Sequence, residues 1–153
     1  MLGLNDEAYK IYQQASAYDQ TNQIPLYGMI QCKIHQDQLD DAEQQLEFLL
    51  EISESEQKTA DQVYLEAIIA WRQKNQKEKA IKLLDQSLNL HITQTKNSQS
   101  NIDFYIKLSA DFLMQLAQQY LVHCGNKPID ANMGVPKHLT RALKLLENVT
   151  KQN

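Results

Sequence analysis

One helical pattern occurs four times in this chain, and it constrains the fold more than any other feature. In each copy a small residue is followed by a bulky residue four positions later and by a third contact residue seven positions later. These offsets place all three residues on one face of an α-helix. The four copies are Ala8, Tyr12 and Ala15; Ala42, Leu46 and Leu49; Ala80, Leu84 and Ser87; and Ala142, Leu146 and Val149. The first two anchoring alanines are 34 residues apart, a period that predicts a repeated helix-turn-helix unit.

A second apolar helix precedes three of the four copies. Apolar residues at spacings of three, four and seven form the stripe with which such a helix packs against the repeated one. The stripes are Leu26, Met29 and Ile30, followed by Cys32 and Lys33; Tyr64, Ala67, Ile68 and Trp71; and Leu113, Leu116, Ala117 and Tyr120. Paired helices at this period resemble the tetratricopeptide repeat, whose units stack into a solenoid.

The turn between the paired helices also repeats. Five residues before the anchoring alanine stand Gly3, Asp37 and Asn75. These residue types tolerate a left-handed backbone best, as a tight turn between helices requires. Lys137 departs from the rule in the fourth copy, where we expect a loop in place of the turn.

The sequence therefore predicts an all-α fold, a tetratricopeptide-repeat solenoid of antiparallel helix pairs with two insertions around the last repeat. The predicted units are a half repeat at 1–20 with one helix, a repeat at 23–52, a repeat at 61–92, an insertion at 93–109, and a repeat at 110–150 with a long internal loop at 125–136. The predicted helices are 5–18, 23–36, 40–52, 61–74, 78–91, 110–123 and 137–150. Ser109 and Gly125 are the predicted caps of the 110–123 helix, and residues 102–108 are expected to add a helical turn.

The two ends of the chain lack the neighbours that such a solenoid requires. Only three residues precede the first turn, and no polar capping helix follows Val149. Because repeat units bury their core only against neighbouring units, the chain is expected to be a piece of a longer solenoid. The alternative is a small three-repeat protein with a frayed amino terminus.

Charge is distributed unevenly along the chain. Residues 1–66 carry 13 acidic and 3 basic side chains, whereas residues 67–153 carry 6 acidic and 12 basic ones. Either the two ends meet different partners, or the charges only solvate the surface. The basic residues lack the aromatic interleaving that nucleic-acid binding favours, so no nucleic-acid partner is predicted. The longest apolar run, at 67–71, is far too short to span a membrane.

The sequence predicts no enzyme, and no catalytic, cofactor-binding or metal-binding residue. His123, Cys124 and His138 match no zinc spacing, and a fourth ligand is not evident. The chain also has no glycine-rich phosphate loop and no nucleophile motif. Trp71 and Tyr120 occupy core positions of the repeat, where packing explains them better than a cofactor does.

The concave face of a solenoid, lined by the first helix of each pair, is its usual binding surface. The anchors predict a largely apolar partner-binding groove there. Its predicted residues are Tyr27, Leu65, Ile69, Met114 and Leu121, among neighbours such as Gln31, Ile34, Arg72 and Gln118. An apolar groove suits a helix or an extended segment buried along it. The competing interpretation is that these side chains touch neighbouring repeats.

A family resemblance rests on particular stretches of the chain. They are Gln-Leu-Asp-Asp-Ala-Glu-Gln-Gln-Leu-Glu-Phe-Leu at 38–49, Val-Tyr-Leu-x-Ala at 63–67, Phe-Tyr-x-Lys-Leu-Ser-Ala-Asp-Phe-Leu at 104–113 and Tyr-Leu at 120–121. Together they resemble the large tetratricopeptide-repeat subunit of intraflagellar transport complex A. The resemblance implies a scaffold of the cilium or flagellum and its base, on the cytoplasmic side, acting in retrograde transport and ciliary protein entry. It implies as partners the other complex A subunits and neighbouring repeats of the same parent chain.

Two other functions stay open at this point. One is a soluble peptide-binding tetratricopeptide-repeat adaptor such as a co-chaperone. Some adaptors of that kind clamp an acidic carboxyl terminus with lysines and asparagines, and the places of those residues here hold Tyr27, Gln31, Leu65 and Glu66. The other is a regulatory solenoid segment of an enzyme.

Overall fold

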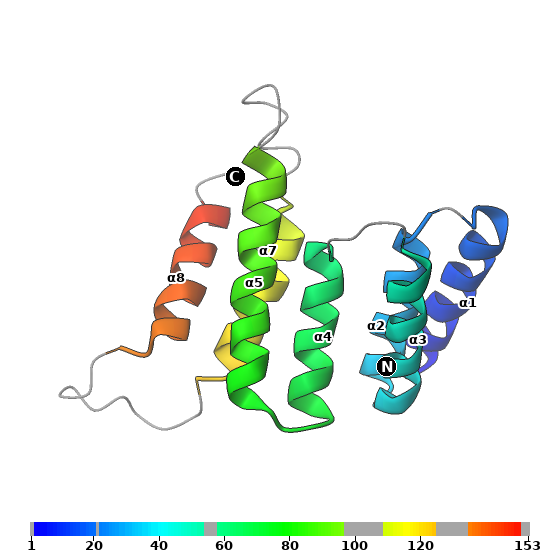
Figure 1. Ribbon diagram of the computed structural model, residues 1–153, viewed down its shortest axis with the longest axis horizontal. Coiled ribbons are helices and arrows are strands. Elements are labelled where there is room, and N and C mark those ends of the chain that lie inside the picture. The colour runs from blue at the N-terminus through cyan, green and yellow to red at the C-terminus, as the bar shows by residue number, and fades with distance from the viewer. Residues whose placement is uncertain (1, 21, 54–57, 97–108, 125–134, 151–153) are drawn as a thin grey trace.

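The computed structural model describes residues 2–20, 22–53, 58–96, 109–124 and 135–150 (Figure 1). Within these ranges every regular element is a helix, so the all-α prediction is confirmed. The helices are α1 (Leu2–Tyr18), α2 (Ile24–His35), α3 (Leu39–Ile52), α4 (Ala60–Arg72), α5 (Lys77–Lys96), α7 (Ala110–Val122) and α8 (Lys137–Thr150).

Successive helices pack as antiparallel pairs that follow one another along the long axis of the molecule. The pairs are α2 with α3, α4 with α5, and α7 with α8, while α1 packs on α2. In Figure 1, α2 lies behind α3, and α7 lies behind α5. This arrangement confirms the predicted solenoid of helix pairs.

The repeated alanines are the close-contact points of the second helices. Ala42, Ala80 and Ala142 are each fully buried, since only a small side chain lets two helices approach at that position. At the third position of the third copy, the buried hydroxyl of Ser87 donates a hydrogen bond of 2.7 Å to the Ala60 carbonyl oxygen. That bond explains how a polar residue occupies a core position. In the first copy, by contrast, Ala15 is exposed.

The predicted turn chemistry is confirmed at two of its three positions. Asp37 has a φ of 60° and Asn75 a φ of 49°, both in the left-handed region. The prediction for Gly3 is wrong, because α1 begins at Leu2 and Gly3 lies inside the helix.

Side-chain caps fix where two of the helices begin. At α4 the Thr59 hydroxyl accepts a hydrogen bond from the Gln62 amide, and the Gln62 side chain accepts one from the Thr59 amide, which is a capping box. At α7 the Phe112 amide donates to the Ser109 hydroxyl over 3.2 Å, so the predicted N-cap is confirmed. The predicted C-cap Gly125 lies outside the described residues.

Helix α5 is longer than the sequence predicts. It continues to Lys96, whereas the prediction ended it at 91 and began a polar insertion at 93. Thr93 donates its hydroxyl to the carbonyl of Asn89, and Thr95 donates to that of His91, so both side chains are satisfied within the helix. Residues 93–96 of the predicted insertion are therefore helical. The predicted turn at 102–108 and most of the predicted loop at 125–136 lie outside the described residues.

Candidate functional site

A polar hollow lies across the first helices of three successive pairs, and we call it the glutamine groove. Its cavity volume is about 210 Å³. Its lining residues are Gln31, Ile34 and His35 of α2, Tyr64, Ile68 and Arg72 of α4, and Gln115, Gln118 and Gln119 of α7. Because three helices contribute equally, the groove exists only when the repeats are stacked.

The glutamine groove has an apolar floor and a polar rim. Ile34, Tyr64 and Ile68 are at most 7% exposed, so they form the floor. Burial raises the pKa of Tyr64 to about 12, and its side-chain hydrogen bond with Gln119 opposes part of that rise. The tyrosine is therefore a neutral hydroxyl at any physiological pH.

Arg72 is the basic residue of the rim, but its guanidinium is already engaged. It donates to the Ile34 carbonyl oxygen over 2.7 Å and to the Asp37 carboxylate over 3.2 Å. None of the described residues that line the groove is acidic. The groove therefore offers carboxamide hydrogen bonds and apolar contact rather than a charge.

The five residues predicted to bind a partner occupy three different environments. Leu65 and Ile69 are 1% and 4% exposed and belong to the core. The Tyr27 hydroxyl hydrogen-bonds Gln23 and Thr59, at the junction of α2 with the start of α4. Met114 and Leu121 are exposed on α7. None of the five lines the glutamine groove, and partner binding by these residues stays a prediction.

On α4 the glutamine groove is lined by Tyr64 and Ile68 together with Arg72, one of the neighbours named for the predicted groove. Tyr64 and Ile68 face the groove, where the sequence placed Leu65 and Ile69. Helix α4 is packed on several sides, and all residues from Gln62 to Ala70 except Glu66 are buried, so its apolar pattern does not reveal which face is which. On α7 the sequence does indicate the groove-facing side, because Gln115, Gln118 and Gln119 fall at helical spacing on one face.

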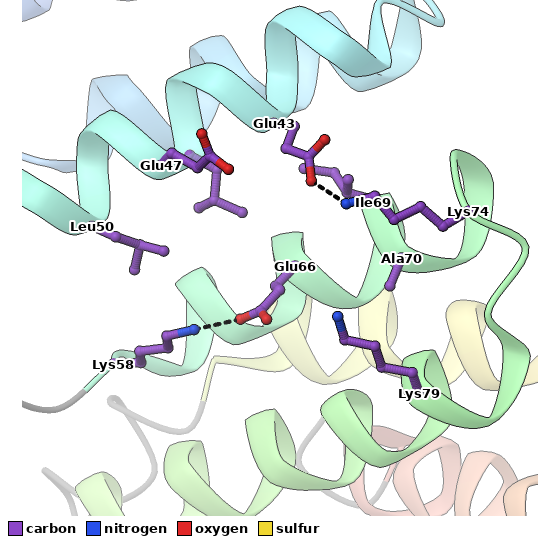
Figure 2. A pocket seen from close by; sticks show the side chains of 10 residues that line it. Glu43, Glu47, Leu50, Lys58, Glu66, Ile69, Ala70, Lys74 and Lys79 are labelled. Carbon is purple, nitrogen blue, oxygen red and sulfur yellow. Dashed lines mark hydrogen bonds and ion pairs between the residues drawn. The ribbon is translucent and has the colours of Figure 1, made fainter.

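A second hollow, which we call the charged pocket, lies where α3 meets α4 and α5 (Figure 2). Its cavity volume is about 180 Å³. The lining residues are Glu43, Leu46, Glu47 and Leu50 of α3, Glu66, Ile69 and Ala70 of α4, and the lysines Lys58, Lys74 and Lys79. Lys74 pairs with Glu43, and Lys58 pairs with Glu66 over 2.7 Å. Because three acidic and three basic groups balance one another, this pocket is unsuited to an ionic ligand.

The charged pocket lies where the acidic part of the chain, residues 1–66, meets the basic part, residues 67–153. Arg72 pairs with Asp37, Gln73 donates to Asp40 over 2.7 Å, and Lys74 pairs with Glu43. The hydrogen bond from Lys74 lowers the pKa of Glu43, and the same bond raises the pKa of Lys74. The charge asymmetry of the sequence therefore has a structural consequence, since opposite charges meet across this junction.

Two further clusters lie towards the carboxyl-terminal half of the molecule, one joining α5, α7 and α8 and one joining the end of α4 to the end of α7. The Tyr120 hydroxyl donates to Asp85 over 2.7 Å, and Arg141 binds the same carboxylate, which joins α5, α7 and α8. The His123 ring packs edge-on against Trp71 with its centroid 4.8 Å away. Among the described residues no group of three or more His, Cys, Asp or Glu is placed to hold a metal ion.

A helix that crosses a membrane must be long and continuously apolar. Within the described ranges, no helix has the length and apolar character needed to cross a bilayer.

Comparison with known proteins gives one family for the whole chain. The family model that matches residues 1–153 describes the second ARM domain of tetratricopeptide repeat protein 21. The chain is 37% identical to human tetratricopeptide repeat protein 21B over 145 residues and 35% identical to the Xenopus laevis protein over 143 residues. It is 30% identical to mouse tetratricopeptide repeat protein 21A over 145 residues.

These alignments cover almost all of the chain but little of each relative. They span 95% of this chain for the human and mouse proteins and 94% for the Xenopus laevis protein. The matched region is 11% of the length of each of these relatives.

Proposed function

The chain belongs to the tetratricopeptide repeat protein 21 family, and from this premise we propose that it is a non-catalytic segment of a protein-protein interaction scaffold. Helical repeats expose long surfaces without a deep, water-excluding active site, which suits them to holding other proteins. The family is the one that the sequence resemblance indicated, the large tetratricopeptide-repeat subunit of intraflagellar transport complex A.

The proposal extends to the role of that complex. The chain would act in retrograde transport and in protein entry into the cilium, at the cilium or flagellum and its base, on the cytoplasmic side. Its partners would be the other complex A subunits and neighbouring repeats of the same parent chain.

The observation that supports this proposal best is the glutamine groove. It runs across three successive helix pairs and is lined by uncharged or already paired side chains. It contains no lysine among its described lining residues, and the guanidinium of Arg72 is already bonded to Ile34 and Asp37, so it does not offer the free cation with which a clamp binds an acidic carboxyl terminus. This favours a scaffold over the co-chaperone alternative.

Met114 and Leu121 are proposed as partner contacts beside the groove. On α7 they lie four residues before and three residues after Gln118, so the three side chains are neighbours on the helix surface. Leu65 and Ile69, which are buried, would support the groove from within the core. Tyr27 would fix the start of α4 through its bond with Thr59.

The test is co-precipitation of complex A subunits with the tagged chain expressed in a ciliated cell. The wild-type chain is expected to bring down at least one complex A subunit. The variant Met114→Glu with Leu121→Glu should bring down less, because it places two charges where apolar contact is expected. A matched control, Gln13→Glu with Gln14→Glu, adds the same charge to exposed positions of α1 and should behave as wild type. Absence of every complex A subunit from the wild-type precipitate would contradict the proposed function.

A further inference from the structure

We propose that mild acid opens the joint between the last two helix pairs, because it charges His123 and His138 at a place that is built for neutral rings. The joint is the contact of α4 and α5 with α7 and α8. This inference concerns the conformation of the solenoid and does not depend on which partner the chain binds. It bears on binding because α7 carries one wall of the glutamine groove.

The two histidines lie where four helix ends meet. His123 is the C-cap of α7, and His138 is the second residue of α8. Trp71, near the end of α4, packs edge-on against the His123 ring with the centroids 4.8 Å apart. Lys77 is the first residue of α5 and acts electrostatically on both rings. The turn from α4 to α5 and the amino end of α8 both lie toward the lower edge of Figure 1.

Each of the two rings has a buried nitrogen without a hydrogen-bond partner among the described residues. These atoms are Nδ1 of His123, whose side chain is 2% exposed, and Nε2 of His138. The other nitrogen of His138 is hydrogen-bonded to the backbone of His123. A charged imidazole has two N–H donors, whereas a neutral one has a single donor. Protonation would therefore place a donor where the fold supplies no acceptor.

The charges that face the two rings are mostly positive. Lys77 opposes protonation of both rings. At His138, Arg141 adds to this effect, and Asp85 opposes it. Burial is the largest cause at both residues, so the pKa of His123 and that of His138 lie below the ordinary value.

The other neighbours provide no counterion for a charged ring. Helix α4 presents Trp71, which does not titrate, and the thiol of Cys124 donates to the Tyr120 carbonyl oxygen over 3.3 Å. Burial raises the pKa of that thiol. The helix dipoles act in opposite directions, since the amino end of α8 disfavours a cation at His138 and the carboxyl end of α7 favours one at His123.

The joint should therefore be closed near neutral pH and should open as the pH falls. Free histidine has a pKa of about 6.5, so below that pH the open form binds protons more readily than the closed form. Each ring shifts the equilibrium toward the open form by up to about tenfold per pH unit, and the two together by up to about a hundredfold.

Two other contacts of the joint determine which end opens. The link from Asp85 to Tyr120 and Arg141 contains no histidine and is expected to hold. His91 lies near the other end of α5, where Asp61 favours its protonation and offsets part of the effect of burial. Opening should therefore begin at the turn from α4 to α5, and the pair of α7 and α8 should pivot without detaching.

The single tryptophan of the chain provides the first test, because Trp71 touches the His123 ring. Its fluorescence emission should shift to longer wavelength between about pH 7 and about pH 5, while far-ultraviolet circular dichroism keeps its helical signal. His123→Phe retains an aromatic contact without a titrating nitrogen, and Lys77→Met removes the charge that opposes protonation, so each should reduce the shift. The control His35→Gln changes an exposed histidine of α2 and should shift as wild type does.

A distance measurement shows whether the joint opens. Spin labels are placed at Gln76, just before α5, and at Leu143 of α8, two exposed positions, with both native cysteines replaced by alanine. Their separation should increase over the same pH range. A control pair at Gln13 of α1 and Gln44 of α3, also exposed, should keep its separation.

Two results would overturn the proposal. One is an emission maximum and a label separation across the joint that stay constant from about pH 7 to about pH 5. The other is loss of the helical signal in step with the tryptophan shift, because that would be global unfolding. If His123→Phe does not fold, Lys77→Met decides alone, and a shift equal to that of wild type refutes the role of the histidines.

Discussion

Arg72 joins the end of one repeat to the turn of the repeat before it. Its guanidinium donates to the Asp37 carboxylate over 3.2 Å and to the Ile34 carbonyl oxygen over 2.7 Å. Asp37 is also the residue that adopts a left-handed backbone in that turn. The same arginine therefore fastens α4 to α2 and sets one wall of the glutamine groove.

Replacement of Arg72 should loosen this junction. Arg72→Met keeps much of the aliphatic stem and removes both hydrogen bonds, and we expect it to lower the free energy of unfolding by about 1 kcal/mol. The figure is modest because the arginine side chain is 37% exposed and water screens its ion pair. Urea unfolding measures the change, and a variant as stable as wild type would show that the junction does not depend on Arg72.

Enlarging a buried repeated alanine should destabilise the fold by steric crowding. Ala80 is fully buried at a close contact of α5, so Ala80→Leu should lower the free energy of unfolding by about 1–3 kcal/mol. The control is Ala15→Leu, the same substitution at an exposed alanine of α1. It should change the free energy of unfolding by no more than about 0.5 kcal/mol. Thermal melting that fails to distinguish the two variants would contradict the register of α5.

The stability of the protein should depend on the residue at position 75, in the turn between α4 and α5. Asn75 has a φ of 49°, which a β-branched residue adopts only with strain. Asn75→Val should therefore lower the free energy of unfolding by about 1–2 kcal/mol. Asn75→Gly is the matched variant, because glycine adopts this conformation without strain and should unfold at a higher urea concentration than the valine variant.

Three partly or fully buried histidines predict a loss of stability in mild acid. Burial lowers the pKa of His91, His123 and His138, and nearby Lys77 adds to the effect at the last two. Below the unfolded value of about 6.5 the unfolded chain binds more protons than the folded one, so stability falls as the pH falls through the folded pKa values. Unfolding free energies should therefore decrease from about pH 7 to about pH 5.

A single substitution tests the origin of this pH dependence. His123→Gln removes one of the three groups and should flatten the decrease. His35→Gln changes an exposed histidine and should leave the decrease as it is in the wild type. Equal slopes for wild type and His123→Gln would show that the buried ring does not titrate in this range.

Repetition made most of the fold predictable. The anchors Ala42, Ala80 and Ala142 are buried as expected, and Asp37 and Asn75 adopt the predicted backbone. These features are local, since each depends on a helix period or on one residue's conformational freedom. The end of α5 was not predictable from polarity alone, because Thr93 and Thr95 satisfy their hydroxyls inside the helix.

The candidate site was less predictable because it depends on how helices rotate against one another. A rotation of α4 by one residue exchanges Leu65 for Tyr64 at the groove, and a helix buried on several sides carries no pattern that reports its rotation. The glutamines of α7 carried a usable signal, because polar residues on one face of a helix that is otherwise packed mark the face that meets water or a ligand.

Site-specific photo-crosslinking in assembled complex A is the most direct test of the central claim, that this segment binds other proteins through the glutamine groove. A photoreactive amino acid is placed at Gln118, in the groove, and separately at Gln44, an exposed position of α3. Crosslinks are expected from position 118 to another complex A subunit or to a distant part of the parent chain, and few or none are expected from position 44. Crosslinks to complex A subunits from position 44 alone would contradict the claim.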